Sequence, residues 1–115
     1  MSHAMPRLTS SVLVSAMVRR ANHAGGSAAV LARGDDTAGG ILILACERGS
    51  GGRLFERGLG PSGDPALLPS GPADGDDSAL TDYWRRRRER DPDLWVVEID
   101  SADAEAIAAE TLGLA

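Results

Sequence analysis

Apolar residues recur along the chain with two different spacings, and each spacing predicts one kind of secondary structure. A first helix is expected from about residue 10, because apolar positions there stand three and four apart: Val12, Leu13, Ala16 and Met17. Thr9 or Ser10 can cap its first turn, and the glycine pair at 25–26 ends it.

Two apolar runs that lack the helical spacing follow, SAAVLAR at 27–33 and GGILILACERG at 39–49, and each predicts a strand. The glycine- and aspartate-rich segment between them, GDDTAGG, predicts a turn, so the two runs are expected to form an antiparallel hairpin. A third strand is expected at 53–57, with Leu54 on one face and Phe55 on the other. Its charged residues indicate a strand near a sheet edge with one solvated side.

The second half of the chain begins with residues 58–77, which are rich in glycine, proline and aspartate and predict a long loop. A second helix follows and ends near Asp91, because Pro92 forces the residue before it out of helical geometry. The run LWVVEI at 94–99 predicts a fourth strand, and the alanine-rich segment 101–114 predicts a short closing helix. The second helix can be capped by one of three residues: Asp76, Asp77 or Ser78.

These elements predict an α+β fold in the order α-β-β-β-α-β-α, with an antiparallel sheet of about four strands and helices on one face. The 115 residues suffice for one core and are too few for two domains that are each stable alone. We expect residues 1–5 to be a leader outside the fold and residues 6–115 to form the single domain. The sequence leaves the position of the fourth strand in the sheet open.

The composition removes several kinds of catalytic chemistry. All 12 basic residues are arginine, which excludes a Schiff-base lysine and a phosphate-loop lysine. The single cysteine, Cys46, lies in an apolar run and is expected to be a small buried side chain. His23 is the one histidine after the leader, so no zinc ligand set is available, and we expect neither a metal nor a cofactor.

Charge and hydropathy indicate the compartment. The formal net charge of -5 at pH 7 opposes general attraction to nucleic acid or to an anionic membrane. No apolar run is long enough to span a bilayer, and the N-terminal apolar run ends in two arginines where a signal peptide would have a cleavage site. Together with a cysteine that has no partner, these features predict a cytoplasmic protein without membrane contact.

Two motifs resemble ligand sites but lack the required context. The segment GLGPSG at 58–63 matches G-x-G-x-x-G, yet prolines follow it and no helix begins there, so a flexible glycine loop is expected. Asp74, Asp76 and Asp77 resemble part of a calcium loop without its closing glutamate, and helix capping is the expected role.

The second helix combines an apolar face with a run of arginines. Leu80, Tyr83 and Trp84 share one face, and together with Trp95 and Val97 they are expected to form the structural core. The arginines of the candidate interaction surface are Arg85, Arg86, Arg87, Arg88 and Arg90. We expect them to be largely neutralised by the acidic residues of the same segment, Asp82, Glu89 and Asp91.

Two stretches carry a family resemblance: the segment from Arg7 to about Leu44, and the segment RRRRERDPDLWVVEID at 85–100. With them the chain resembles the family named domain of unknown function 1491, small proteins found mainly in alphaproteobacteria. The resemblance implies a compact α+β domain in the cytoplasm. It implies no activity, and it assigns no catalytic residue.

The residues predict function only at the level of class. Because no nucleophile, base and orienting group come together, we expect a non-enzymatic protein that binds a protein partner or itself through the exposed edges of its sheet. The first alternative is nucleic-acid binding through the arginine helix. An enzyme that uses the glycine loop at 58–63 is the least favoured hypothesis.

Overall fold

Helices and strands alternate along the part of the chain that the computed structural model describes, residues 8–73 and 76–114. The predicted order of elements is right, with one further strand, and the predicted leader at 1–5 lies outside the described residues. The elements are α1 (Ser10–His23), β1 (Ser27–Ala32), β2 (Ile41–Glu47), β3 (Ser50–Leu59), β4 (Pro65–Ser70), α2 (Asp77–Arg90), β5 (Trp95–Asp100) and α3 (Ala104–Thr111).

The strands form one mixed sheet in the order β1-β5-β2-β3-β4, where an antiparallel sheet of about four strands was predicted. The neighbours β2 and β5 are parallel, and every other neighbouring pair is antiparallel. The strand that the prediction lacks, β4, lies inside the segment expected to be a long loop. It was not predicted because it contains Pro65 and Pro69, and proline is rare in strands except at an edge.

The predicted hairpin between the first two strands is wrong, because β5 lies between β1 and β2. The glycines of the connecting segment pack against a backbone instead of forming a tight turn. A Cβ atom on Gly34 or Gly39 would lie 2.1 or 2.0 Å from the carbonyl oxygen of Asp93, so only glycine fits at this contact. The same carbonyl accepts a hydrogen bond from the backbone N–H of Asp35 at 3.0 Å.

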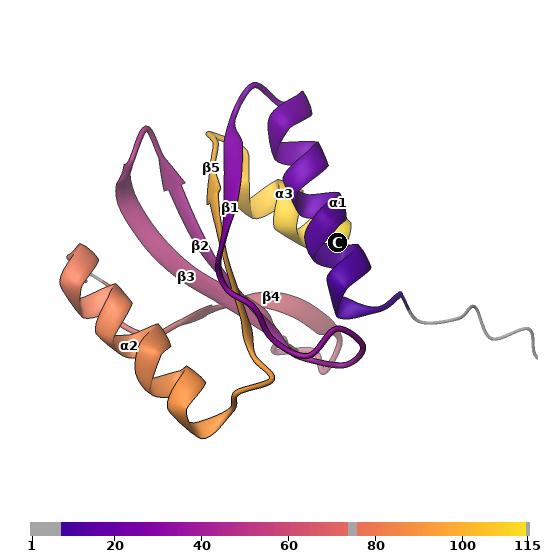
Figure 1. Cartoon of the computed structure of the whole chain (residues 1–115). Helices are drawn as coiled ribbons and strands as arrows, with labels where there is room; N and C mark the ends of the chain where they lie inside the picture. The colour runs from indigo at the N-terminus through magenta and orange to yellow at the C-terminus, as the bar shows by residue number, and fades with distance from the viewer. Residues whose placement is uncertain (1–7, 74–75, 115) are drawn as a thin grey trace, which may run out of the picture.

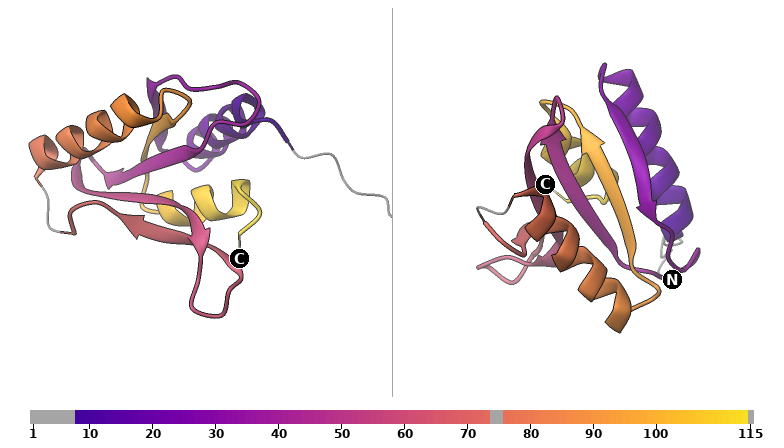
Figure 2. Two further views of the ribbon diagram at one scale, coloured as in Figure 1. Left: turned by 90° about the horizontal axis from the view of Figure 1, so that it is seen from below. Right: turned by 60° about the vertical axis from the view of Figure 1, so that its left-hand side comes forward.

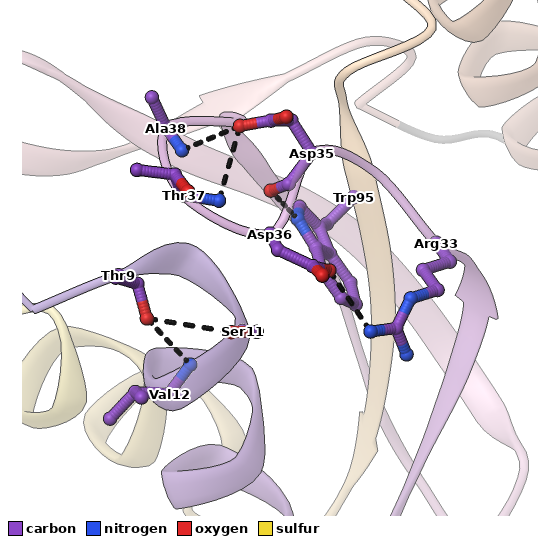
Figure 3. A network of polar contacts seen from close by, with 9 residues as sticks. All are labelled: Thr9, Ser11, Val12, Arg33, Asp35, Asp36, Thr37, Ala38 and Trp95. Carbon is purple, nitrogen blue, oxygen red and sulfur yellow. Dashed lines mark hydrogen bonds and ion pairs between the residues drawn. The ribbon is translucent and has the colours of Figure 1, made fainter.

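The connection between β1 and β2 is further fixed by side chains of its own and of β5 (Figure 3). The carboxylate of Asp35 accepts hydrogen bonds from the backbone N–H groups of Thr37 and Ala38, at 3.1 and 2.8 Å. Its backbone carbonyl accepts from the indole Nε1–H of Trp95 at 2.7 Å. Arg33 pairs with Asp36 at 2.9 Å and lies 5.2 Å from the centre of the Trp95 ring. These contacts hold the start of β5 against the loop.

Helices cover both faces of the sheet, not one as predicted: α1 and α3 lie on one face and α2 on the other (Figures 1 and 2). The reason lies in the central strands, which are apolar on both sides. The odd positions of β2 and β5, such as Ile43 and Val97, pack under α1 and α3, while Leu42 and Val96 pack under α2. A strand with two apolar faces needs a cover on each of them.

The predicted core residues divide between these two faces. Trp95 and Val97 are buried in the layer below α1 and α3. On the other face, Leu80 of α2 is buried against the sheet, and Tyr83 and Trp84 of the same helix are half-buried beside it. The aromatic residues of the second half therefore turn inward on opposite sides of the sheet and do not form one cluster.

Candidate interaction surface

The structure separates the five arginines of α2 into two with partners in the fold and three that are exposed. Arg87 reaches Glu56 of β3 with two nitrogens, at 2.6 and 3.0 Å. Arg88 donates hydrogen bonds to the backbone carbonyls of Pro92 and Leu94, the latter at 3.1 Å. These two side chains fix α2 to the sheet and to the turn before β5, so they are not free for a partner.

Arg87 and Glu56 belong to a half-buried polar group with Ser70 and Tyr83, which we call the Glu56 cluster. The hydroxyl of Ser70 lies 2.5 Å from a carboxylate oxygen of Glu56 and 2.8 Å from the hydroxyl of Tyr83. The hydrogen bond from Arg87 holds the pKa of Glu56 below its ordinary value, despite the opposing effect of burial. The pKa of Tyr83 is also lowered, first by its hydrogen bond to Ser70. The cluster joins α2 to β3 and β4.

The remaining arginines, Arg85, Arg86 and Arg90, are exposed. Within the described residues, none of them has an ion pair with the acidic residues of the helix, so the predicted neutralisation along α2 is wrong. Exposed pairs of this kind contribute little free energy. Asp91 instead accepts a hydrogen bond from the backbone N–H of Asp93 at 3.1 Å, which shapes the turn after the helix.

A groove of about 350 Å³ lies where α2 leaves part of its face of the sheet uncovered. Among the residues that line it are Leu31, Leu44, Leu80, Trp84 and Glu98. The indole Nε1–H of Trp84 is buried and has no hydrogen-bond partner in the described part of the chain.

Cys46 also lines this groove, and its thiol is protonated at neutral pH. Burial raises its pKa from 9.0 to about 11, and the charges of Asp100 and Glu98 act in the same direction. A reactive cysteine requires the opposite shift, because the thiolate is the nucleophile.

The outer edge of β1 is the feature that the sequence did not single out. β1 is the last strand of the sheet on its side, and Ser27, Ala29, Val30 and Leu31 are exposed. Val30 and Leu31 keep 45% and 37% of their surface, which is high for aliphatic residues of a strand. Across the described residues, no hydrogen bond outside the β1–β5 ladder involves Ser27–Ala32. The strand contains no charged residue and no proline.

The opposite edge of the sheet differs in this respect. β4 carries Pro65 and Pro69, which have no N–H to donate and therefore interrupt pairing with a further strand. The signal for an open edge was thus present in the sequence of β1. It could not be used because the sequence left the position of the fourth strand open, so that strand could equally have covered the outer edge of β1.

The motifs that suggested ligand sites have structural roles. Residues 60–64 close the hairpin between β3 and β4, where the N–H of Gly60 donates to the carbonyl of Asp64 at 2.8 Å, and no helix follows. Asp76 caps α2 by accepting from the N–H of Ala79 at 2.8 Å, and Asp74 lies outside the described residues. The part of the chain that the structure describes holds no group of three metal-ligating side chains, and His23 is exposed at the end of α1. Among the described residues, no helix has the length and apolar character needed to cross a membrane.

Comparisons with known proteins place the chain in one family. The family model described as protein of unknown function (DUF1491) matches residues 8–109. A crystal structure of a DUF1491 family protein from Caulobacter crescentus is 32% identical, with a TM-score of 0.76 over 88% of this chain and 94% of that one. The solution structure of protein Atu0922 from A. tumefaciens is 28% identical, with a TM-score of 0.72 over 95% of both chains. No match is found among curated proteins.

Proposed function

Because the chain belongs to the DUF1491 family, whose description assigns no activity, we propose from its surface that it is a non-enzymatic module that binds protein at the edge of β1. In this mode an extended segment of the partner adds to the sheet as a further strand. Backbone hydrogen bonds supply affinity, and the side chains on both faces supply specificity.

The observation that carries the proposal is the unprotected edge of β1. Natural proteins usually blunt such an edge with charges, prolines or a covering element, because it pairs readily with other strands. β4 has two prolines, whereas β1 has four exposed residues and neither charge nor proline. The half-buried polar side chains of types that can act in catalysis hold α2 in place: Glu56, Ser70 and Tyr83.

Photo-cross-linking in cells tests this function. A photo-reactive amino acid replaces Val30 at the β1 edge or, as a control, Leu59, which is 70% exposed at the end of β3. We expect protein adducts from position 30 that position 59 does not give, identified by mass spectrometry. The absence of adducts at position 30, or the same adducts at both positions, would refute the proposal.

Nucleic-acid binding is a second candidate, supported by the three exposed arginines of α2. Arg85, Arg86 and Arg90 have no ion pair in the described residues, although the net charge of -5 opposes binding. Three phosphate contacts would lower the logarithm of the affinity by about 2 to 3 for each decade of salt. A slope near zero, or binding unchanged by Arg85→Glu with Arg86→Glu, would remove this candidate.

A further inference from the structure

We propose that the partner at this edge is a second copy of the chain, joined through an antiparallel β1–β1 pair about a two-fold axis. The inference rests on the proposed function, because it requires the β1 edge to accept a strand. It adds the identity of that strand and the size of the assembly.

The sequence of β1 complements itself. In an antiparallel pair related by a two-fold axis, the same segment of each copy lies opposite the other. The regular part of β1 is Ser27–Val30, since a bulge follows between Val30 and Ala32. Every cross-strand pair within it joins small or aliphatic residues, so no like charges oppose each other. Arg33, the next charged residue, is held by Asp36 at 2.9 Å.

The helix beside this edge is uncharged on the same side. α1 packs on β1 and β5 and has α3 on one flank, where Arg20 donates to Thr111 of α3. The opposite flank therefore lies over the outer edge of β1 (Figure 2). By helical spacing it carries Ser11, Ser15, Val18 and Asn22, none of which is charged. A quarter of all residues are charged, so a strand and a helix flank without any charge form a distinct strip.

The two edges of the sheet differ, and this difference fixes the size of the assembly. Pairing of β1 with the β4 of another copy would repeat without end and produce fibres. Pro65 and Pro69 block that contact. Each copy then has one competent edge, and a β1–β1 pair consumes it, so association stops at a dimer with one continuous sheet.

Analytical ultracentrifugation tests the dimer, with concentrations from about 10 μM to about 1 mM because a single strand pair is a small interface. We expect the mass to rise from one chain of 12.0 kDa toward two. Val30→Lys should raise the dissociation constant at least about tenfold, since it places charge and a long side chain in the strip. Leu59→Lys, the same kind of change at another exposed aliphatic residue, should change it by less than about twofold.

Hydrogen exchange supplies a second measurement that needs no substitution. Within Ser27–Val30, the backbone amides that point away from β5 should exchange more slowly at high than at low concentration, while those of β4 should not change. A chain that stays monomeric throughout, or a dimer that Val30→Lys leaves intact, overturns the inference. If the chain is monomeric but position 30 still cross-links to other proteins, strand addition stands and only the second copy is excluded.

Discussion

Glu56 and Arg87 lie 31 positions apart in the chain and meet with two hydrogen bonds, each side chain keeping 29% of its surface. Arg87 thus pairs with a residue on another element, and not with one three or four positions away on α2. Neutralising Glu56 would leave the guanidinium partly buried beside a weaker acceptor, and such losses cost about 1–2 kcal/mol. We therefore expect Glu56→Gln to lower the free energy of unfolding by this amount in urea denaturation at pH 7.

The same carboxylate gives a pH dependence whose sign follows from its lowered pKa. Because the folded-state pKa lies below the unfolded value near 4.5, the stabilisation is complete above that value and is lost as the pH falls through the folded pKa. The wild type should lose more stability than Glu56→Gln between pH 5 and about pH 3. Glu105→Gln, which removes an exposed pair with Arg53, is the control and should keep the wild-type profile. Identical pH profiles for wild type and Glu56→Gln would contradict the assignment.

The two tryptophans differ in how their indole N–H groups are satisfied. Trp95 donates to the carbonyl of Asp35 at 2.7 Å, whereas the buried N–H of Trp84 has no partner in the described residues. Replacing Trp84 by Phe removes an unsatisfied donor, which offsets the loss of apolar surface. We expect Trp84→Phe to change stability by less than about 1 kcal/mol and Trp95→Phe to lower it by about 2 kcal/mol or more. Equal losses in denaturant titrations would show that the Trp84 donor is satisfied in solution.

At the scale of elements, the sheet order requires a close approach of the β1–β2 connection to the segment just before β5. Gly39→Ala would place a methyl group 2.0 Å from the Asp93 oxygen, a backbone atom that cannot move alone. We expect a loss of more than about 2 kcal/mol in thermal unfolding, because the loop must detach or distort. Gly40→Ala meets only a side-chain atom of Leu94, at 3.5 Å, and should cost less than about 1 kcal/mol. Similar melting temperatures for the two variants would mean that the loop adapts freely.

Elements whose signals are local could be predicted from the sequence. The caps of α1 and α2 are Thr9 and Asp76, both among the predicted residues, and α2 ends at Arg90 just before Pro92. Elements whose positions depend on distant residues could not. The insertion of β5 between β1 and β2 brings Gly34 and Gly39 against the backbone of Asp93, and turn glycines look the same in the sequence whether they serve a hairpin or a contact of this kind.

The candidate surface shows the same division. The sequence indicated an interaction helix from a run of arginines, but the partner of Arg87 is Glu56 on β3, which helical spacing cannot reveal. The open edge of β1 could be recognised only after the strand order was known. The uncharged composition of β1 can be read from the sequence, but the strand that lies beside it cannot.

At the scale of the whole molecule, one mixed sheet lies between two helix layers, and β1 with the adjoining flank of α1 forms an uncharged strip at one edge of it. Association through this strip should therefore depend little on salt, since it involves no ion pair. The dissociation constant measured by ultracentrifugation should change by less than about threefold between 50 mM and 500 mM NaCl. A steep salt dependence would instead indicate the exposed arginines of α2.

The place of β5 also bears on how the protein is made. β5 follows β2 by nearly fifty residues, yet it is the strand that pairs with both β1 and β2. A ribosome that has released only the first ninety residues therefore holds a chain whose most apolar strand, β2, has an open side. The native sheet can close only after β5 has left the ribosome, and until then that open side is available to chaperones or to neighbouring chains.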